Sequence, residues 1–365
     1  MAQPNPDAYR KTMIRTYRQM PNIDKNMFLT SFFKTNPEDV TESEFITYDI
    51  TRSDEDIAPV LTDISTGAIV VSEEVFTNKT IKPPAIALKQ PFNIWDLNKR
   101  QAGDTEYDNP NYQAVLASKV QRSWKTMSDM IMRTIELQAS QILQTGIITL
   151  YDAAGTARYT LDYKPKGTHI ATAGVSWATA TTDVIADLEN LADVVRNDGL
   201  VDPTTLIMGS DCFKNFIKTN QAALYFNKET LNLGQLDPRM TNSGAKYQGV
   251  VHVGNYRFDI WTYGGRYKNA AGTKIKYISD DNLIMLPDMD DLDFRKVFGG
   301  IPVVVDSLAE VRQFLPSRVT VPGAFDFKPR VYTDEAAETT YSEIKSRPLL
   351  VPASIDRFAS LDTTP

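Results

Sequence analysis

The chain has 365 residues, of which 42% are hydrophobic and 23% are charged, and its formal net charge is −7. This composition is ordinary for folded protein and excludes a chain that is disordered throughout. A single cysteine, Cys212, excludes an internal disulfide. The longest apolar runs, such as residues 303–305 and 349–351, are far shorter than the roughly 20 residues that cross a bilayer.

Residues 1–25 form a basic arm, because they carry five cations and two carboxylates and leave a net −10 for the rest of the chain. Tyr9, Met13, Tyr17 and Met20 recur at helical spacing between the cations. Two interpretations stay open: contact with a partner protein, nucleic acid or another acidic surface, or a helix packed on its own domain. The arm lacks the apolar core of a signal peptide, so we expect a protein kept inside a cell. The acidic remainder argues against DNA binding as its main function.

Residues 46–90 are predicted to be mostly extended chain. Tyr48 and Ile50 belong to a run in which apolar and polar residues alternate. Pro83 and Pro84 exclude a helix in the last part of the segment and favour a strand at the edge of a sheet. A segment with so little apolar mass cannot bury much of itself. It is therefore predicted to be a long two-stranded arm that projects and needs a neighbour.

A helical pattern of unusual length follows over residues 111–146, after Asn109 and Pro110 as starting signals. At 1.5 Å per residue this helix would span roughly 54 Å. We expect it to be half buried against a sheet, with Gly146 as its end, because Ser123 and Gln138 interrupt the heptads of a lone coiled coil. The apolar stripe is Leu116, Val120, Trp124, Met127, Ile131, Ile135 and Ile142. Polar residues expected on the other faces are Lys119, Arg122, Lys125, Arg133 and Glu136.

The rest of the chain reads as an α/β region. A hairpin is expected over residues 147–163. The next element is a helix capped by Thr181 or Thr182, which ends at residues 197–199. A short helix capped by Ser210 or Asp211 is expected after it. Further strands are expected to form a mixed sheet, with one more hairpin at 267–278. These strands are residues 204–208, 250–253, 256–263, 283–286 and 301–305.

Residues that could carry chemistry are few. His169 and His252 lack metal-ligand spacing to each other or to Cys212. Cys212 lies just inside a predicted helix start, where the helix dipole can lower a thiol pKa. No histidine is near it in sequence, and the same holds for Ser210, so a buried structural cysteine is favoured over a nucleophile.

Two other motifs are compatible with chemistry but depart from the patterns that would establish it. The acidic run 288–293 resembles part of a calcium-binding loop. Three positions depart from that pattern: Leu292 replaces an oxygen ligand, Asp293 replaces a glycine and Gly299 replaces a glutamate. A solvated loop of Asp288, Asp290, Asp291 and Asp293 is the alternative. No phosphate loop, dinucleotide motif or nucleophile elbow occurs, and the pairs Gly264–Gly265 and Gly299–Gly300 fit turns or bulges. We therefore predict no catalytic, cofactor-binding or metal-binding residue.

Four segments in order along the chain, residues 80–97, 263–272, 280–286 and 347–358, resemble the lambda-type (gpE) family of tailed-phage major capsid proteins. The resemblance covers about residues 28–361. It implies an α+β fold of the Hong Kong 97 type. The implied parts are an N-terminal arm (1–45), an extended loop (46–90), a peripheral domain (91–180) with a spine helix (111–146) and an insertion hairpin (147–163), an axial domain (181–325), and a C-terminal strand that returns to the peripheral domain (326–365).

The function that this resemblance implies is that of a major capsid protein of a tailed phage. Copies would self-assemble into hexamers and pentamers of an icosahedral head, in the host cytoplasm, around double-stranded DNA that is not bound by sequence. A separate scaffold protein, a portal and a decoration protein would be partners, and no enzymatic activity, cofactor or membrane is expected. An acidic inner face would repel the packaged DNA.

Other readings stay open. Lys79, Lys82 and Lys89 lie on or near the extended loop, where some capsids of this fold crosslink lysine to asparagine, but lambda-type relatives are not expected to do so.

A cellular encapsulin-like nanocompartment shell is the first alternative function, and an α/β enzyme is the less favoured second.

Overall fold

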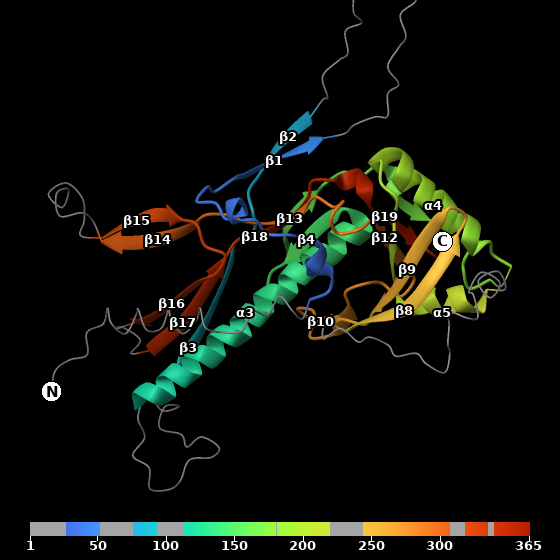
Figure 1. Cartoon of the computed structure of the whole chain (residues 1–365). Helices are drawn as coiled ribbons and strands as arrows, with labels where there is room; N and C mark the ends of the chain where they lie inside the picture. Colours follow the sequence, from blue (N-terminus) through green and yellow to red (C-terminus); the bar gives the residue numbers. More distant parts are fainter. Residues whose placement is uncertain are drawn as a thin grey trace, which may run out of the picture.

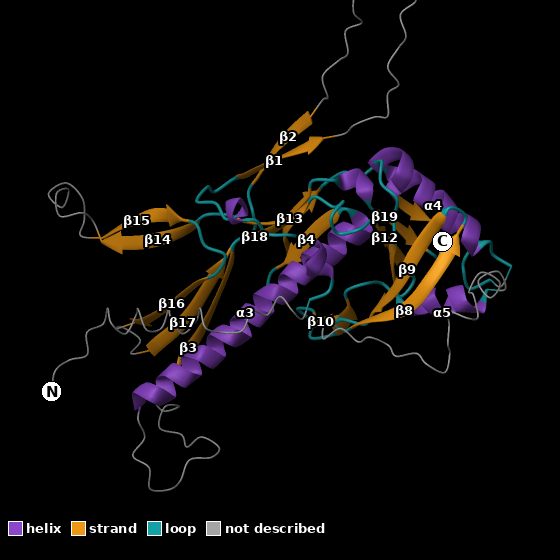
Figure 2. Cartoon of the chain, in the orientation of Figure 1, coloured by secondary structure: helices purple, strands orange, loops and turns teal. Residues whose placement is uncertain are grey.

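A long helix, α3 (Tyr112–Thr145), is the central element of the computed structural model. The structure describes residues 27–51, 76–92, 112–179, 181–219, 244–306, 318–334 and 339–365. Expectations for the basic arm, for residues 52–75 of the extended loop and for the helix start at Asn109 and Pro110 lie outside these residues. Helix α3 runs from a small sheet at its N-terminal half to a larger sheet at its C-terminal end, and two strand pairs project from the body (Figures 1 and 2).

Helix α3 confirms the predicted length, its apolar stripe and its end. The stripe from Val120 to Ile142 is buried over its described length. Its 34 residues span about 51 Å. Gly146 ends the helix with φ 70°, and a Cβ there would lie 2.5 Å from Pro165. Packing against sheets is also confirmed, since α3 contacts β17 (Thr339–Ser346), β18 (Pro348–Pro352) and β4 (Ile147–Tyr151).

The small sheet has the strand order β16-β17-β3, with β16 at Lys328–Asp334 and β3 at Ile86–Phe92. Strand β3 lies at an edge, as the prolines predicted, and Pro83 and Pro84 separate it from β2 (Phe76–Ile81). Strand β2 pairs instead with β1 (Ile46–Thr51) in a two-stranded ribbon. The last part of the extended segment is therefore two strands in two sheets, because the prolines cannot continue a hydrogen-bonded ladder.

The larger sheet is mixed, with the order β6-β19-β12-β7-β9-β8. These strands are Ile170–Thr172, Ala359–Asp362, Asn282–Leu286, Thr205–Met208, Tyr256–Tyr263 and Ala245–Val253. Alternate residues of its strands enter two cores: Leu206 and Met208 join the cluster with α4 (Val184–Gly199) and α5 (Ser210–Lys218), whereas Ile207 joins the cluster around α3. The sheet draws strands from the segments 91–180, 181–325 and 326–365, and the domain boundaries stay a prediction.

The hairpins expected at 147–163 and 267–278 are confirmed as β4 with β5 (Ala157–Asp162), and β10 (Arg266–Lys268) with β11 (Lys274–Lys276). Residues 301–305 do not complete the mixed sheet, because β14 (Ile301–Asp306) pairs with β15 (Arg318–Gly323) in a separate ribbon. The expected C-terminal strand is likewise divided among β17, β18 and β19, in three sheets.

Two predicted helix caps are wrong, whereas the predicted end of α4 at residues 197–199 is confirmed. Helix α4 is capped by Asp183, whose side chain accepts a hydrogen bond from the Ala186 N–H at 3.0 Å, and not by Thr181 or Thr182. Directly after Gly199, Leu200 adopts the left-handed conformation with φ 57°. Helix α5 follows Gly209 without a side-chain cap. The C-terminal end of α4 is closely packed, because a Cβ on Gly199 would lie 2.6 Å from the Asp356 carbonyl oxygen.

Candidate assembly site

The chain that precedes the extended loop is fixed to α3 by the buried carboxylate of Glu136. Its Oε1 accepts hydrogen bonds from the Leu29 N–H at 2.9 Å and the Tyr263 hydroxyl at 2.8 Å. Its Oε2 accepts from the N–H and the Oγ1 of Thr30, at 2.9 and 2.6 Å. The expectation that Glu136 occupies an outer face is wrong, because four donors replace water around a carboxylate that is 0% exposed.

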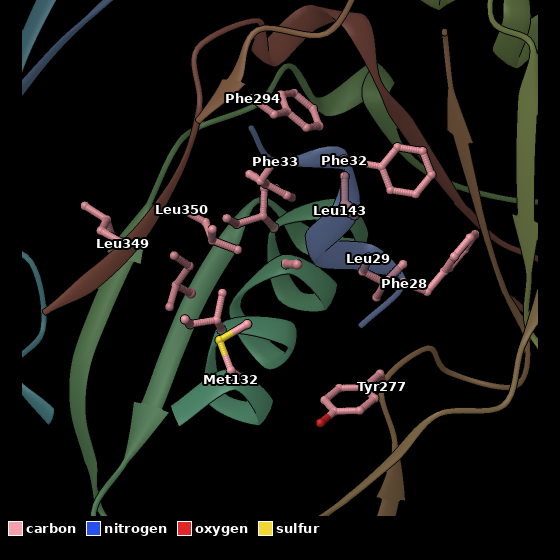
Figure 3. Close-up of a cluster of buried hydrophobic side chains, with 14 of the residues drawn as sticks. Phe28, Leu29, Phe32, Phe33, Met132, Leu143, Tyr277, Phe294, Leu349 and Leu350 are labelled. Atoms are coloured by element: carbon pink, nitrogen blue, oxygen red, sulfur yellow. The ribbon is translucent and has the colours of Figure 1, made fainter. Parts of the chain in front are cut away.

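Aromatic packing completes this attachment. The short helix η2 (Leu29–Phe32) lies against the C-terminal half of α3, and the rings around it point into the core (Figure 3). The ring of Phe28 lies 5.6 Å from that of Tyr263, and Phe33 stacks on Phe294 at 5.0 Å. Burial and the Glu136 carboxylate together raise the pKa of Tyr263, so its hydroxyl stays a donor. The start of the extended segment is thus held at one place on the body.

Three glutamines on α3 bind the backbone of two strands and of the segment that follows β11. Each side-chain amide donates to a carbonyl and accepts from an N–H of that backbone, and the Gln144 amide also donates to the Ser140 carbonyl. The partners are the Pro348 carbonyl and Leu350 N–H for Gln138, both groups of Thr149 for Gln141, and the Tyr277 carbonyl and Ser279 N–H for Gln144. Gln138, which breaks the heptad pattern, is therefore a structural contact. The helix serves as a support for strands β18 and β4 and for the segment that follows β11.

Arg347 holds the roots of the two projecting ribbons together. Its guanidinium donates to the carbonyl oxygens of Gly300 at 3.0 Å, Pro83 at 3.3 Å and Glu44 at 3.4 Å. Glu44 precedes β1, Pro83 follows β2, and Gly300 precedes β14. A planar cation with five N–H donors suits such a three-way contact. We call these four residues the junction.

The junction is also closely packed. A Cβ on Gly300 would lie 2.0 Å from the Glu42 carbonyl oxygen, and one on Gly299 would lie 2.4 Å from Pro83. The Gly300 N–H donates to the Ser43 carbonyl at 2.8 Å. The glycine pair thus allows two chain segments to approach, which is more than the turn or bulge that the sequence indicated. An ion pair between Lys82 and Glu44 lowers the pKa of the Glu44 carboxyl.

Both ribbons extend from the junction with only two strands each among the described residues. The pair β1–β2 has six residues in register, from Ile46 opposite Ile81 to Thr51 opposite Phe76. The two ribbons point in different directions (Figure 1). A two-stranded ribbon is marginal in water on its own. Large apolar side chains beside their roots are exposed, among them Phe45 at 49% and Phe325 at 39%. This geometry suits elements that become covered by another molecule.

Of the residues weighed for chemistry, His169 and Cys212 are buried in the core and His252 is exposed. His169 is buried, with Nδ1 2.7 Å from the Phe358 carbonyl and Nε2 3.0 Å from Asp198. His252 is exposed on β8. Cys212 is buried in the core of α5, as expected for a structural cysteine, and burial raises its pKa. The structure does not bring these three residues together into one site.

The carboxylates of the acidic run 288–293 contact different residues instead of meeting at one point. Asp288 accepts a hydrogen bond from the Thr204 hydroxyl at 2.8 Å, and Asp290 pairs with Lys34 at 3.1 Å. Asp293 accepts from Arg295 at 2.9 Å. In the part of the chain that the structure describes, no group of three histidine, cysteine or acidic residues could hold a metal ion. Within the same residues, no helix has the length and apolar character needed to span a bilayer.

Comparison with known proteins decides what this architecture is. The family model for phage major capsid protein E matches residues 10–363. The chain belongs to this family. It is a phage major capsid protein, a structural protein that self-assembles into shells and is located in the virion. The resemblance seen in the sequence is therefore confirmed. No curated protein sequence matches the chain.

The chain is also similar to solved structures. A capsid protein of an E. coli CFT073 prophage is 17% identical, with a TM-score of 0.62 over 96% of this chain and 98% of that chain. This likeness shows the fold, and the capsid fold of the Hong Kong 97 type is confirmed. A phage-related protein from Bordetella bronchiseptica RB50 is 11% identical, with a TM-score of 0.48 over 97% and 96% of the two chains. An encapsulin of Synechococcus elongatus PCC 7942 is 9% identical, with a TM-score of 0.43 over 100% and 96%.

Two residues that organise this capsid protein escaped the sequence analysis. Glu136 was placed on a polar face, and its position directly after Ile135 of the stripe gives no signal of burial, because Lys125 directly after Trp124 is exposed. Arg347 lies in a segment that carried the resemblance, but its role gave no local signal, since its three acceptors are backbone carbonyls. Backbone acceptors have no sequence signature.

Proposed function

We propose that this capsid protein forms the icosahedral head of a tailed phage, assembled as hexamers and pentamers in the host cytoplasm and enclosing double-stranded DNA without reading its sequence. The observation that carries the proposal is the pair of two-stranded ribbons fixed at the Arg347 junction. Such ribbons gain a stable environment only when other copies cover them, so the stability of the subunit depends on assembly.

The domain assignment is part of the proposal. Residues 1–45 act as the N-terminal arm and 46–90 as the extended loop, with β3 returning to the body. Segment 91–180 with α3, and segment 326–365, form the peripheral domain. Segment 181–325 forms the axial domain that meets its copies at the capsomer centre. The Glu136 contact supports the assignment, because it fixes the point at which the arm meets the spine helix.

Partners and the inner surface follow the same reasoning. A separate scaffold protein, a portal and a decoration protein would direct and complete the head. The net −10 outside the arm would keep DNA mobile inside an acidic shell. Covalent crosslinking is not part of the proposal: Lys82 already pairs with Glu44, and the Lys89 ammonium lies 5.3 Å from the Tyr341 ring centre. A ladder of covalent multimers on denaturing gels would contradict this point.

Negative-stain electron microscopy of the purified chain tests the proposal. Closed shells, tubes, or rings of five and six copies are expected at micromolar concentration. A persistent monomer under all conditions, including addition of a scaffold protein, would contradict it. Particle contents then separate a phage head from an encapsulin-like compartment, since nuclease-protected DNA indicates the first and an enclosed enzyme the second.

A further inference from the structure

The hairpin of β10 and β11 carries like charges in opposite positions. Its register places Arg266 opposite Lys276. In the same register Lys268 lies opposite Lys274. Residues that lie opposite each other, and residues two apart on one strand, share a face of a hairpin. All four cations therefore lie on one face, and residues 260–279 contain no carboxylate in a chain whose net charge is −7. We call this element the cationic hairpin.

Three of the four cations have no acidic partner. Lys276 contacts the Asp280 carboxylate. The side chains of Arg266, Lys268 and Lys274 form no ion pair within the part of the chain that the structure describes. Like charges that lie directly opposite each other on paired strands are destabilising. The arrangement therefore suits an anion that another molecule supplies.

The cations occupy the outer face of the hairpin. Tyr267, on the opposite face, packs against the core around α3, and its ring lies 5.2 Å from that of Tyr277. The side chains of Arg266, Lys268 and Lys274 are exposed. The cationic face is thus directed away from the body of the subunit and is open to another molecule.

The tip of the hairpin holds the two strands in a fixed geometry. The Asn269 Oδ1 accepts a hydrogen bond from the Thr273 N–H at 2.8 Å, and Gly272 adopts φ 83°. The tip also lies against the turn of the hairpin β4–β5, since a Cβ on Gly155 would lie 3.9 Å from the Ala270 Cβ. The cations are therefore presented on a preorganised support, which lowers the entropy that is lost when an anion binds.

The exposed side of α3 extends this positive surface. The cationic hairpin lies beside the C-terminal half of α3 (Figure 1), and the Tyr277 hydroxyl donates to the Arg133 carbonyl at 3.4 Å. Arg122 precedes Arg133 by eleven residues, which is three turns along the same helical face, or about 17 Å. Both arginines are exposed, and Asp129 is the one carboxylate between them in the sequence. The positive surface therefore continues from the hairpin along the helix.

This surface fits the phosphates of double-stranded DNA. A two-stranded ribbon matches the major groove of B-DNA, which is about 12 Å wide, and cations in two rows can contact phosphates without reading the bases. Single strands are bound instead by aromatic rings on which the bases stack, and Tyr267 lies on the opposite face of the hairpin. We propose that the cationic hairpin, with Arg122 and Arg133 of α3, binds the phosphate backbone of double-stranded DNA and faces the inside of the shell.

This inference rests on the proposed function, because a head that encloses DNA brings the duplex to this surface. It adds a site of contact to a chain whose net negative charge repels DNA elsewhere. Each copy would neutralise about three or four phosphates, which gives a weak contact that a shell repeats in every copy. The genome is therefore held at many weak points and stays mobile, with no preference for sequence.

Anisotropy of a short fluorescent DNA duplex, titrated with the unassembled full-length chain, tests the inference. The hairpin variant carries Lys268→Gln and Lys274→Gln. It should bind the duplex at least about tenfold more weakly than the native chain at 0.1 M salt, because two fewer phosphates are neutralised. For the same reason the slope of log affinity against log salt should become smaller by about 2. Equal affinities, or equal salt slopes, in the two chains would overturn the inference.

A matched control removes two exposed cations that lie away from the hairpin, with Lys89→Gln on β3 and Arg257→Gln on β9. Its duplex affinity should stay within about twofold of the native value. Both variants keep the basic arm 1–25, so the difference between them reports the hairpin. A control that loses as much affinity as the hairpin variant would show a general effect of charge and overturn the inference.

The hairpin variant should also be at least as stable as the native chain in thermal unfolding, because it removes a like-charge pair. A loss of duplex binding in that variant is then not a loss of folding. An acidic protein surface is the other class of partner for these cations. A hairpin variant that binds the duplex as the native chain does, but forms at least tenfold fewer shells, would indicate such a partner and overturn the inference.

The direction of the hairpin in the shell provides a second test. Thr273→Cys places an exposed thiol at the tip, and labelling is selective because Cys212 is buried. A maleimide on a polymer too large to pass the shell should label the unassembled chain and should label closed shells at least tenfold less. Equal labelling of both would place the hairpin outside and overturn the inference. Failure of the chain to form any closed shell would instead count against the proposed function.

Discussion

Thr30 and Glu136 are 106 positions apart and share two hydrogen bonds, from the Thr30 N–H and Oγ1 to the same carboxylate oxygen at 2.9 and 2.6 Å. The contact joins the chain before the extended loop to the C-terminal half of the long helix. Because both carboxylate oxygens accept a backbone N–H and a hydroxyl, the arrangement needs a carboxylate rather than an amide.

Glu136→Gln should therefore destabilise the subunit. The new NH2 group faces donors, so at least one backbone N–H of Leu29 or Thr30 loses its acceptor, at about 1–3 kcal/mol. Chemical unfolding of the unassembled subunit measures the change. Glu189→Gln, at an exposed position of α4, is the control and should change stability by less than about 0.5 kcal/mol. An unchanged midpoint for Glu136→Gln would show that the carboxylate is not required.

Arg347→Lys should loosen both ribbon roots while the cores stay folded. A single ammonium cannot reach the three carbonyls that the guanidinium joins. Hydrogen exchange by mass spectrometry should show faster exchange near residues 41–46, 81–85 and 299–302, with α4 unchanged, and shell yield should fall. The exposed Arg158→Lys is the matched control. Uniform exchange behaviour in both variants would argue against the junction.

Gly300→Ala should be among the most damaging single-methyl changes in the chain. Its Cβ would lie 2.0 Å from the Glu42 carbonyl oxygen, so the backbone at the junction must move. Overpacking of this kind costs about 1–3 kcal/mol. The comparison is Gly174→Ala, where no atom lies within 4 Å of the new Cβ. Thermal unfolding and soluble yield distinguish the two, and equal behaviour would refute the close approach.

Asp198→Asn should give a pH-dependent loss of stability. Burial by itself would raise the pKa of Asp198, but hydrogen bonds from Lys166 and His169 outweigh it and hold the pKa below its usual 3.8. A carboxyl with a lowered folded-state pKa contributes stability above the unfolded value, and this stability is lost as the pH falls through the folded value.

The difference between native and Asp198→Asn subunits should thus be about 1–2 kcal/mol near pH 7 and shrink below about pH 3.8. Denaturant titrations across this range provide the measurement. Asp129→Asn on α3 corrects for the general effect of removing a carboxyl. A difference that stays constant down to pH 3 would show that the charge of Asp198 is not what stabilises this contact.

Local sequence patterns predicted the helices and strands more accurately than they predicted which strands pair with each other. The apolar stripe of α3, the hairpin at 147–163 and the edge position of β3 followed from spacing and from proline chemistry. The separate ribbon of β14 could not be foreseen, because a strand run shows which residues are apolar but not which distant strand will bind them. Likewise, the cap of α4 moved to Asp183, since several adjacent polar residues can cap equally well by sequence.

The long helix, the extended arm before it and the family could be recognised from the amino-acid sequence, because periodicity, proline positions and short motifs are properties of neighbouring residues. The burial of Glu136, the contact of Arg347 with two ribbons and the position of the cationic hairpin beside α3 became visible in the folded chain. Each of these depends on donors, acceptors or charges brought from distant parts of the chain. A polar side chain shows its chemistry in the sequence, but its partner exists only after folding.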